Sequence, residues 1–199
     1  MAKKRALQPP EHSAQPPASS DQMSARVRLL VGEGARLLAA KRPGEAIVKL
    51  TEAWELDSQN VAVAINLGGA YILQGKPDRA IPVLEAASLL EPDNAMVWSN
   101  LAAAYLGKLP LATSERQQKA IEAYEWVLAL DERAPHIHYN LGLIYLERDE
   151  PLQAASHFQS ALETDPNDRD ARYWLDKIRE GARTDRAPDE DRRANSATT

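Results

Sequence analysis

Histidines are the side chains of this sequence best suited to chemistry, and there are four of them. His12 lies near the N-terminus, in a stretch rich in Pro, Gln and Ser. His136 and His138 are two residues apart, so on a helix they point in different directions. His157 belongs to a separate predicted helix, where its place in the helical pattern points outward. Because a metal ion needs ligands that converge, we expect no metal site.

Catalytic motifs are also missing from the sequence. There is no cysteine, which excludes disulfides, thiolate nucleophiles and Cys–zinc sites. No glycine-rich phosphate loop, HExxH or GxSxG occurs. Acidic residues alternate with Lys and Arg on faces that we expect to be exposed to solvent. We therefore expect that the protein is not an enzyme and binds no cofactor.

The elements that position these residues form a repeating unit. Residues 61–94 have the pattern of two amphipathic helices, with Gly75 ending the first and Pro77 starting the second. Alanines in matching contexts recur at spacings of 34, 40 and 34 residues, at Ala46, Ala80, Ala120 and Ala154. Another column of small residues is Gly34, Gly68, Ala102 and Gly142. The longer spacing reflects an insertion between Ala102 and Ala120. A fixed period of this length predicts a solenoid, in which each unit buries its apolar face against its neighbours.

Around these columns the sequence resembles the tetratricopeptide repeat family. Repeat two carries the family pattern at Leu67, Gly68, Tyr71, Ala80, Leu84, Ala87 and Pro92. Repeat four carries it at Leu141, Gly142, Tyr145, Ala154, Phe158, Ala161 and Pro166. Repeat three fits but has Glu132 in place of the closing Pro, and repeat one departs most. The resemblance implies an all-α fold, a right-handed solenoid of four tetratricopeptide-like helix pairs plus a C-terminal capping helix.

The repeats also predict where the parts of the chain begin and end. We expect disordered tails at both ends, over residues 1–23 and 182–199, because these stretches lack large apolar groups. The array between them covers residues 24–181. Its expected units are 27–60, 61–94, 95–134 with the six-residue insertion, 135–168, and a capping helix over 169–180 that stops at Gly181.

Two local features interrupt the regular pattern. Pro82 falls inside the second helix of repeat two, where we expect it to bend one turn. In repeat three, Ser114 and Gln117 form a capping box that predicts a helix start near Glu115. The insertion before it carries Leu109 and Leu111, which either fold back onto the array or offer a small apolar contact.

The resemblance further implies a binding face, the concave side lined by the first helix of each repeat. Reading the family's phases onto this sequence gives the candidate partner-binding residues Arg28, Ile65, Asn66, Gly69, Met96, Asn100, Tyr139, Asn140 and Leu143. One asparagine recurs in each repeat from the second onward, and its amide suits the C=O and N–H groups of a bound peptide. These asparagines could instead bond across neighbouring helices, and both interpretations stay open. Relatives that capture acidic C-termini line this face with Lys and Arg, whereas Arg28 is the only basic residue here.

These features favour a non-catalytic adaptor or scaffold that binds a partner polypeptide. The alternatives are a self-associating array that uses its convex face, where Trp126 should point outward, and an accessory subunit of an enzyme complex. The net charge of −5 argues against binding to nucleic acid. No stretch is apolar for long enough to span a membrane, and no secretory signal is apparent, so we expect a cytoplasmic protein without membrane contact.

Overall fold

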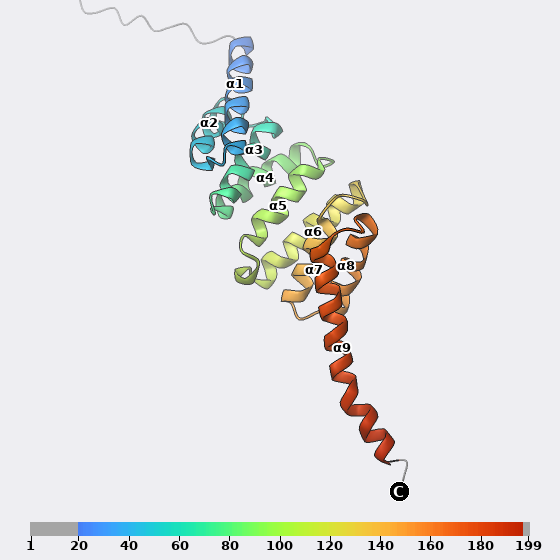
Figure 1. Ribbon diagram of the computed structural model, residues 1–199. Helices are drawn as coiled ribbons and strands as arrows, with labels where there is room; N and C mark the ends of the chain where they lie inside the picture. The colour runs from blue at the N-terminus through green and yellow to red at the C-terminus, as the bar shows by residue number, and fades with distance from the viewer. Residues whose placement is uncertain (1–19, 197–199) are drawn as a thin grey trace, which may run out of the picture.

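The structure is a row of antiparallel helix pairs. In this computed structural model, residues 20–196 are described, with side chains up to Ala182. The described residues form nine α-helices and one short 3-10 helix, and they contain no strand (Figure 1). The elements are α1 (Ser20–Ala39), α2 (Pro43–Leu56), α3 (Val61–Leu73), α4 (Pro77–Leu90), α5 (Ala95–Leu106), η1 (Leu109–Leu111), α6 (Ser114–Leu130), α7 (Ile137–Glu147), α8 (Pro151–Thr164) and α9 (Arg169–Ser196).

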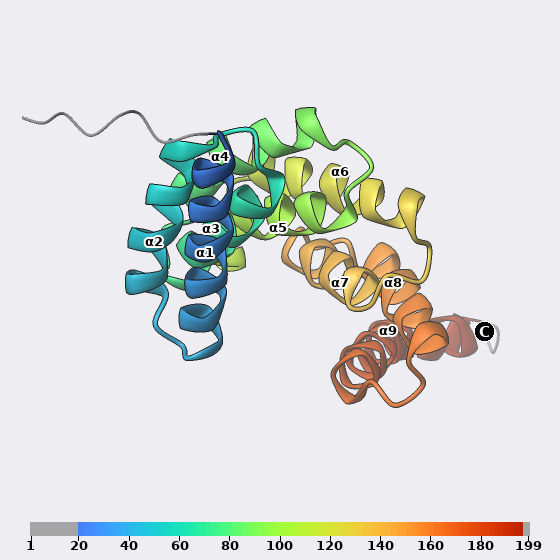
Figure 2. The same ribbon diagram turned by 90° about the horizontal axis from the view of Figure 1, so that it is seen from above.

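Helices pair in the order of the sequence. The pairs are α1 with α2, α3 with α4, α5 with α6, and α7 with α8, and α9 packs against α8. Successive pairs stack on one another, so that α1 lies against α3 and α3 against α5 (Figure 2). We call α1, α3, α5 and α7 the inner helices and α2, α4, α6 and α8 the outer helices. The predicted all-α solenoid is confirmed.

A small residue on each inner helix faces a large residue on its outer partner. A Cβ atom added to the glycine of such a pair would lie only 2.6 or 2.7 Å from the large side chain. The pairs are Gly34–Leu50, Gly68–Leu84 and Gly142–Phe158. All three large side chains are fully buried. In repeat three the same places hold Ala102 and Tyr124, both of which are buried. The spaced column of small residues in the sequence therefore marks the close approach of two helices.

Asparagine side chains cap two of the inner helices. Asn60 caps α3 and Asn94 caps α5, each by accepting a hydrogen bond from a backbone N–H of the first turn. The same column in repeat four holds Ala134, which has no side chain able to cap. There α7 begins only at Ile137, and His136 before it takes a φ of 64°, which is uncommon for a residue other than glycine. Repeat four therefore lacks the regular start of its inner helix.

The insertion in repeat three divides between packing and exposure. Gly107 ends α5 with a φ of 54°, and η1 follows. Leu109 packs against the core of repeats three and four, whereas Leu111 is 78% exposed. Leu109 therefore folds back onto the array as one of the two alternatives expects, and a contact through Leu111 stays a prediction. Thr113 caps α6, which starts at Ser114, one residue before the predicted start near Glu115.

The ends of the array differ from the sequence expectation. α1 starts at Ser20, within the stretch expected to be a tail. α9 continues through Gly181 to Ser196 and projects beyond the array (Figure 1). The expected stop at Gly181 fails because the residues around it include strong helix formers such as Arg, Glu and Ala. Residues 1–19 and 197–199 of the expected tails lie outside the described residues. No helix of the described part is long and apolar enough to cross a membrane.

Pro82 lies inside α4, which is nonetheless continuous from Pro77 to Leu90. We expect Pro82→Ala to raise the free energy of unfolding by about 1–3 kcal/mol, because alanine restores the N–H that can bond the carbonyl of Asp78. Urea denaturation followed by circular dichroism measures the change. Pro151→Ala, at the exposed first position of α8, is the control and should change stability by less than about 0.5 kcal/mol. A loss of stability in Pro82→Ala would show that this helix depends on the proline.

Candidate functional site

The exposed side of the adjacent inner helices α3 and α5 is the candidate site. Neither helix contains Asp, Glu, Lys or Arg. The sequence-predicted residues Ile65, Asn66 and Gly69 lie on α3, and Met96 and Asn100 lie on α5. All five are at least partly exposed. We call these five residues the inner strip. An uncharged, partly apolar surface of this kind suits contact with another polypeptide better than contact with an ion or a phosphate.

Asn66 and Asn100 occupy equivalent places on these two helices. The Nδ2 atom of Asn66 donates to the carbonyl oxygen of Ala62 at 2.8 Å, and that of Asn100 donates to the carbonyl oxygen of Met96 at 3.0 Å. Both bonds stay within one helix and do not cross to a neighbour. Among the described residues no donor reaches the Oδ1 atom of either side chain. Each amide is therefore oriented by its own helix and still offers an acceptor.

The rest of the inner strip is small or apolar. A Cβ atom added to Gly69 would meet nothing within 4 Å, so no packing contact requires a glycine there. The Met96 side chain is 60% exposed and Ile65 is half-buried. Met adapts readily to different partners because its side chain is unbranched and flexible. The strip thus combines two oriented amides with open space and adaptable apolar surface.

The three candidate residues on α7 have different surroundings. α7 packs mainly against α6 and α8 rather than against α5. Tyr139 and Leu143 pack against the core of repeat four, and the Tyr139 ring lies 5.8 Å from the Phe158 ring. Burial raises the pKa of Tyr124 to about 12, while a polar contact with Asn140 works in the opposite direction. The predicted row of three asparagines therefore has two members on adjacent helices and a third set apart.

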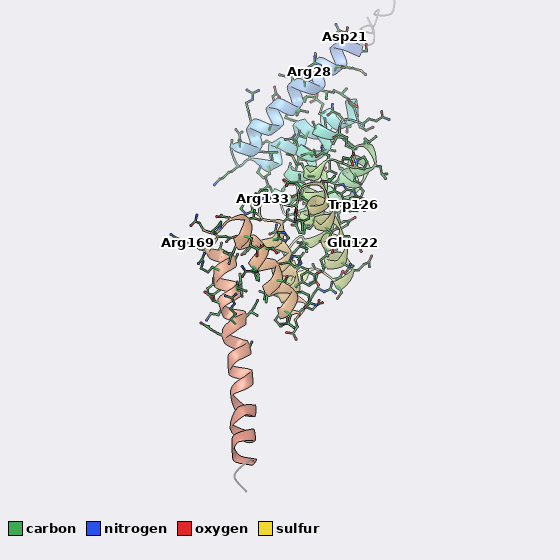
Figure 3. All side chains as sticks on the ribbon, turned by 90° about the vertical axis from the view of Figure 1, so that its right-hand side faces the viewer. Asp21, Arg28, Glu122, Trp126, Arg133 and Arg169 are labelled. Atoms are coloured by element: carbon green, nitrogen blue, oxygen red, sulfur yellow. The ribbon has the colours of Figure 1, made fainter. Side chains whose placement is uncertain are left out.

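Arg28 lies on α1, toward the N-terminal end of the array (Figure 3). Its side chain is exposed. The neighbouring basic residue Arg26 is already paired with Glu52 at 2.6 Å. Arg28 is thus an exposed cation on α1, and its place on a binding face stays a prediction. A single exposed guanidinium provides little of the charge that a carboxylate-binding face requires.

Trp126 lies on the outer helix α6 and is 52% exposed (Figure 3). Its ring stacks on that of Trp98 from α5, with centroids 5.6 Å apart and planes inclined by 15°. The indole N–H of Trp98 donates to the carbonyl oxygen of Pro92 at 2.7 Å. Trp126 is therefore held against a second, anchored aromatic ring. Its outward position agrees with the sequence pattern, but the sequence did not indicate the stack.

His138 and His157 come together, contrary to the sequence-based expectation that the histidines do not converge. Their Nδ1 atoms are 3.2 Å apart, and the His157 ring stacks on that of Tyr145 at 5.3 Å. His157 occupies the same column as Lys49 and Val83, which are half-buried, and Ala123, which is buried. That column could have shown that His157 faces inward. In the described part of the chain, no group of three or more His, Cys, Asp or Glu side chains could hold a metal ion.

A hollow of about 410 Å³ lies beside the insertion of repeat three. The ends of α3 and α5 and the start of α6 line it, and the ion pair between Asp78 and Arg116 spans its rim. Leu73 and Leu111 contribute exposed apolar surface. The hollow lies at an edge of the array. The residues of α3 and α5 that line it come from the last turns of these helices, whereas Asn66 and Asn100 lie on earlier turns.

These features define a class of protein. The described residues form stacked helix pairs with an uncharged inner strip, and no group of three or more of their His, Cys, Asp or Glu side chains could hold a metal ion. Two family models described as tetratricopeptide repeat match residues 37–106 and 111–169. The chain belongs to the tetratricopeptide repeat family. Proteins of this family are in general scaffolds for protein–protein interaction and are typically not catalytic.

Solved structures support the same fold. The chain is 22% identical to MamA with a TM-score of 0.70, over 80% of this chain and 84% of that one. It is 20% identical to PilF of Pseudomonas aeruginosa with a TM-score of 0.68, over 81% and 71% of the two chains. It is 22% identical to a chain of the APC/C hetero-tetramer Cut9–Hcn1 with a TM-score of 0.67, over 79% and 32%. No curated protein matches it in sequence. Identities this low show the fold alone.

Proposed function

We propose that this protein is a non-catalytic adaptor that holds a partner polypeptide along the inner strip. The observation that carries this proposal is the pair Asn66 and Asn100, oriented at equivalent places on adjacent helices with their Oδ1 acceptors unengaged. Backbone N–H groups of an extended segment can donate to these acceptors without regard to the segment's sequence. Open space at Gly69 lets the backbone of the segment approach the helices.

The partner segment is uncharged and apolar where it meets the strip. α3 and α5 offer no charged residue for an ion pair, and Ile65 and Met96 offer apolar contact. Binding is therefore expected to depend little on salt, because few charges are brought together. This chemistry also disfavours the capture of an acidic C-terminus, for which Arg28 is the only basic candidate on this face.

Asn100→Ala is expected to weaken partner binding by about 0.5–1.5 kcal/mol, which is a several-fold rise in Kd. Stability should change little, because the only internal bond lost runs between Asn100 and Met96 in the same helix. The measurements are calorimetric titration with a purified partner, identified by cross-linking and mass spectrometry, and thermal unfolding of the same variant. Asn167→Ala, in the exposed turn before α9, is the matched control and should alter neither. Unchanged binding with lowered stability would show that Asn100 serves packing alone.

A second candidate function is self-association or assembly through the convex face. The half-exposed Trp126, fixed by its stack on Trp98, is the observation that favours it. The two functions make opposite predictions for a pair of variants. Ile65→Glu places a charge on the inner strip and should abolish adaptor binding, while Trp126→Ala should leave it intact. If Trp126→Ala instead removes partner binding or converts an oligomer to a monomer in a sizing measurement, the convex face is the site.

A further inference from the structure

A pair of histidines joins the start of α7 to α8. His138 is the second residue of α7, and its Nδ1 atom lies 3.2 Å from Nδ1 of His157 on α8. A hydrogen bond between two ring nitrogens needs one donor and one acceptor. At least one of the two imidazoles must therefore be neutral for the contact to hold. If both imidazoles are in the doubly protonated, cationic form, two donors and two positive charges face each other.

The start of α7 lacks the side-chain cap that α3 and α5 have. α3 and α5 are capped by Asn60 and Asn94, but Ala134 occupies that place in repeat four and offers no side-chain acceptor. His136, immediately before the helix, takes the left-handed conformation. α7 also packs less extensively on the preceding outer helix than α3 and α5 do. Beside the packing of buried Ile137 and of Tyr139 on Phe158, the bond from His138 to His157 ties this helix end to α8.

Side chains of α6, α7, α8 and the turn before α7 lie around the histidine pair. Glu132, in the turn before α7, and Glu163, on α8, face His138 and favour its charged form. On the other side, Tyr145 of α7 lies flat on the His157 ring, with an angle of 5° between the planes. Glu125 of α6 and the ion pair of Arg148 with Glu150 lie around Tyr145. Glu132 and Glu163 favour the charged form of His138 without forming a bond to either Nδ1 atom, and Arg133 lines the same hollow as these three residues.

We propose that His138 and His157 form a proton-sensitive latch that ties the start of α7 to α8 near neutral pH and loosens it in mildly acidic solution. Release loosens repeat four, at the end of the array where the inner helix is shortest. The neighbouring repeats, which carry the inner strip, contain no such pair. The latch is independent of partner binding and can be tested on the protein alone.

The sign of the effect follows from burial. Burial lowers the pKa of His138, and burial followed by repulsion from His138 lowers the pKa of His157. A histidine whose pKa is lower in the closed state than in the open state binds protons preferentially when open. The stabilisation is therefore complete above the ordinary histidine pKa of about 6.5 and is lost as pH falls below it. The carboxylates of Glu132 and Glu163 oppose the lowering of the His138 pKa. They therefore narrow the pH range over which the stabilisation is lost.

Hydrogen exchange of the full chain at about pH 7.5 and about pH 5.5 tests the latch. After correction for intrinsic exchange rates, the opening of the first turns of α7 is expected to rise at the lower pH, by at most about tenfold for each histidine, with α3 as internal reference. His157→Phe keeps a ring on Tyr145 but cannot be protonated, so only His138 is left to titrate and the pH response of α7 should be smaller than in the parent chain. His136→Asn, at the exposed residue before α7, should retain the pH response of the parent because Asn tolerates a positive φ.

Two results would overturn the proposal. One is equal opening of α7 at both pH values in the parent chain, and the other is an undiminished pH response in His157→Phe. If His157→Phe does not fold, NMR titration of the histidine ring protons of the parent chain decides instead. Coupled titration of His138 and His157 below the ordinary histidine range supports the latch, whereas independent titration within that range refutes it.

Discussion

Phe158→Ala is expected to lower the free energy of unfolding by about 3–5 kcal/mol, the largest effect of any single change considered for this chain. Phe158 is fully buried on α8. Its ring fills the space above Gly142 of α7, where an added Cβ would lie only 2.7 Å away, and it meets the ring of Tyr139 at 5.8 Å. Removing the ring leaves a cavity that a glycine on the facing helix cannot fill.

Urea denaturation read by circular dichroism, together with hydrogen exchange in α7 and α8, measures this loss. Because each repeat contacts only its neighbours, protection should fall most in repeat four and least in repeat one. Leu152→Ala is the matched control, since Leu152 is on the same helix but is 82% exposed. Its effect should stay within about 0.5 kcal/mol. A loss of less than about 1 kcal/mol in Phe158→Ala would be incompatible with the packing of α7 on α8 described above.

Leu84→Ala and Gly68→Ala are expected to destabilise the protein separately and to compensate one another when combined. Leu84 is fully buried, and its loss should cost about 2–5 kcal/mol. A Cβ on Gly68 would lie 2.7 Å from Leu84, so Gly68→Ala should cost about 1–3 kcal/mol by overpacking. In the double variant, the new methyl group enters the space that Leu84 vacates. The double variant should therefore be more stable than the sum of the single changes predicts, by about 0.5–3 kcal/mol.

A double-mutant cycle by urea denaturation measures this coupling. Gly69→Ala is the control, because it adds the same methyl group on the next residue of the same helix, where nothing lies within 4 Å. There alanine should stabilise the helix by about 0.5–1 kcal/mol. Opposite signs for Gly68→Ala and Gly69→Ala would distinguish a packing glycine from a surface glycine. Strict additivity of Gly68→Ala and Leu84→Ala would refute the close contact of these two residues.

The sequence by itself determined the helix pairs and their stacking, because these depend on interactions repeated at a fixed spacing. The column that contains Gly68 and Gly142 faces the column that contains Leu84 and Phe158, and any slip would break several such contacts at once. Proline at the start of outer helices and asparagine before α3 and α5 reinforced the same register. Local signals and global packing therefore agreed over most of the chain.

The end of α9 was not predictable from one residue. Gly181 indicates a stop only where the chain then leaves the helix in a left-handed conformation. Here strong helix formers on both sides, such as Glu180 and Ala182, favour continuation past Gly181, and α9 extends to Ser196. The surroundings of the candidate residues on α7 were likewise not predictable from their places in the repeat. Their places in the repeat match those of Ile65, Asn66 and Gly69, yet α7 lacks a side-chain cap and packs mainly against α6 and α8 rather than against α5.

Only the tertiary structure decided which polar and aromatic side chains meet. His138 and His157 are on different helices, as are Trp98 and Trp126, and periodicity within one helix cannot show a contact between two. The direction of the asparagine amides was also beyond the sequence, since an Asn side chain can bond its own helix or a neighbouring one. The repeat fixes which face a residue occupies, whereas the distance between two faces depends on how every intervening side chain packs.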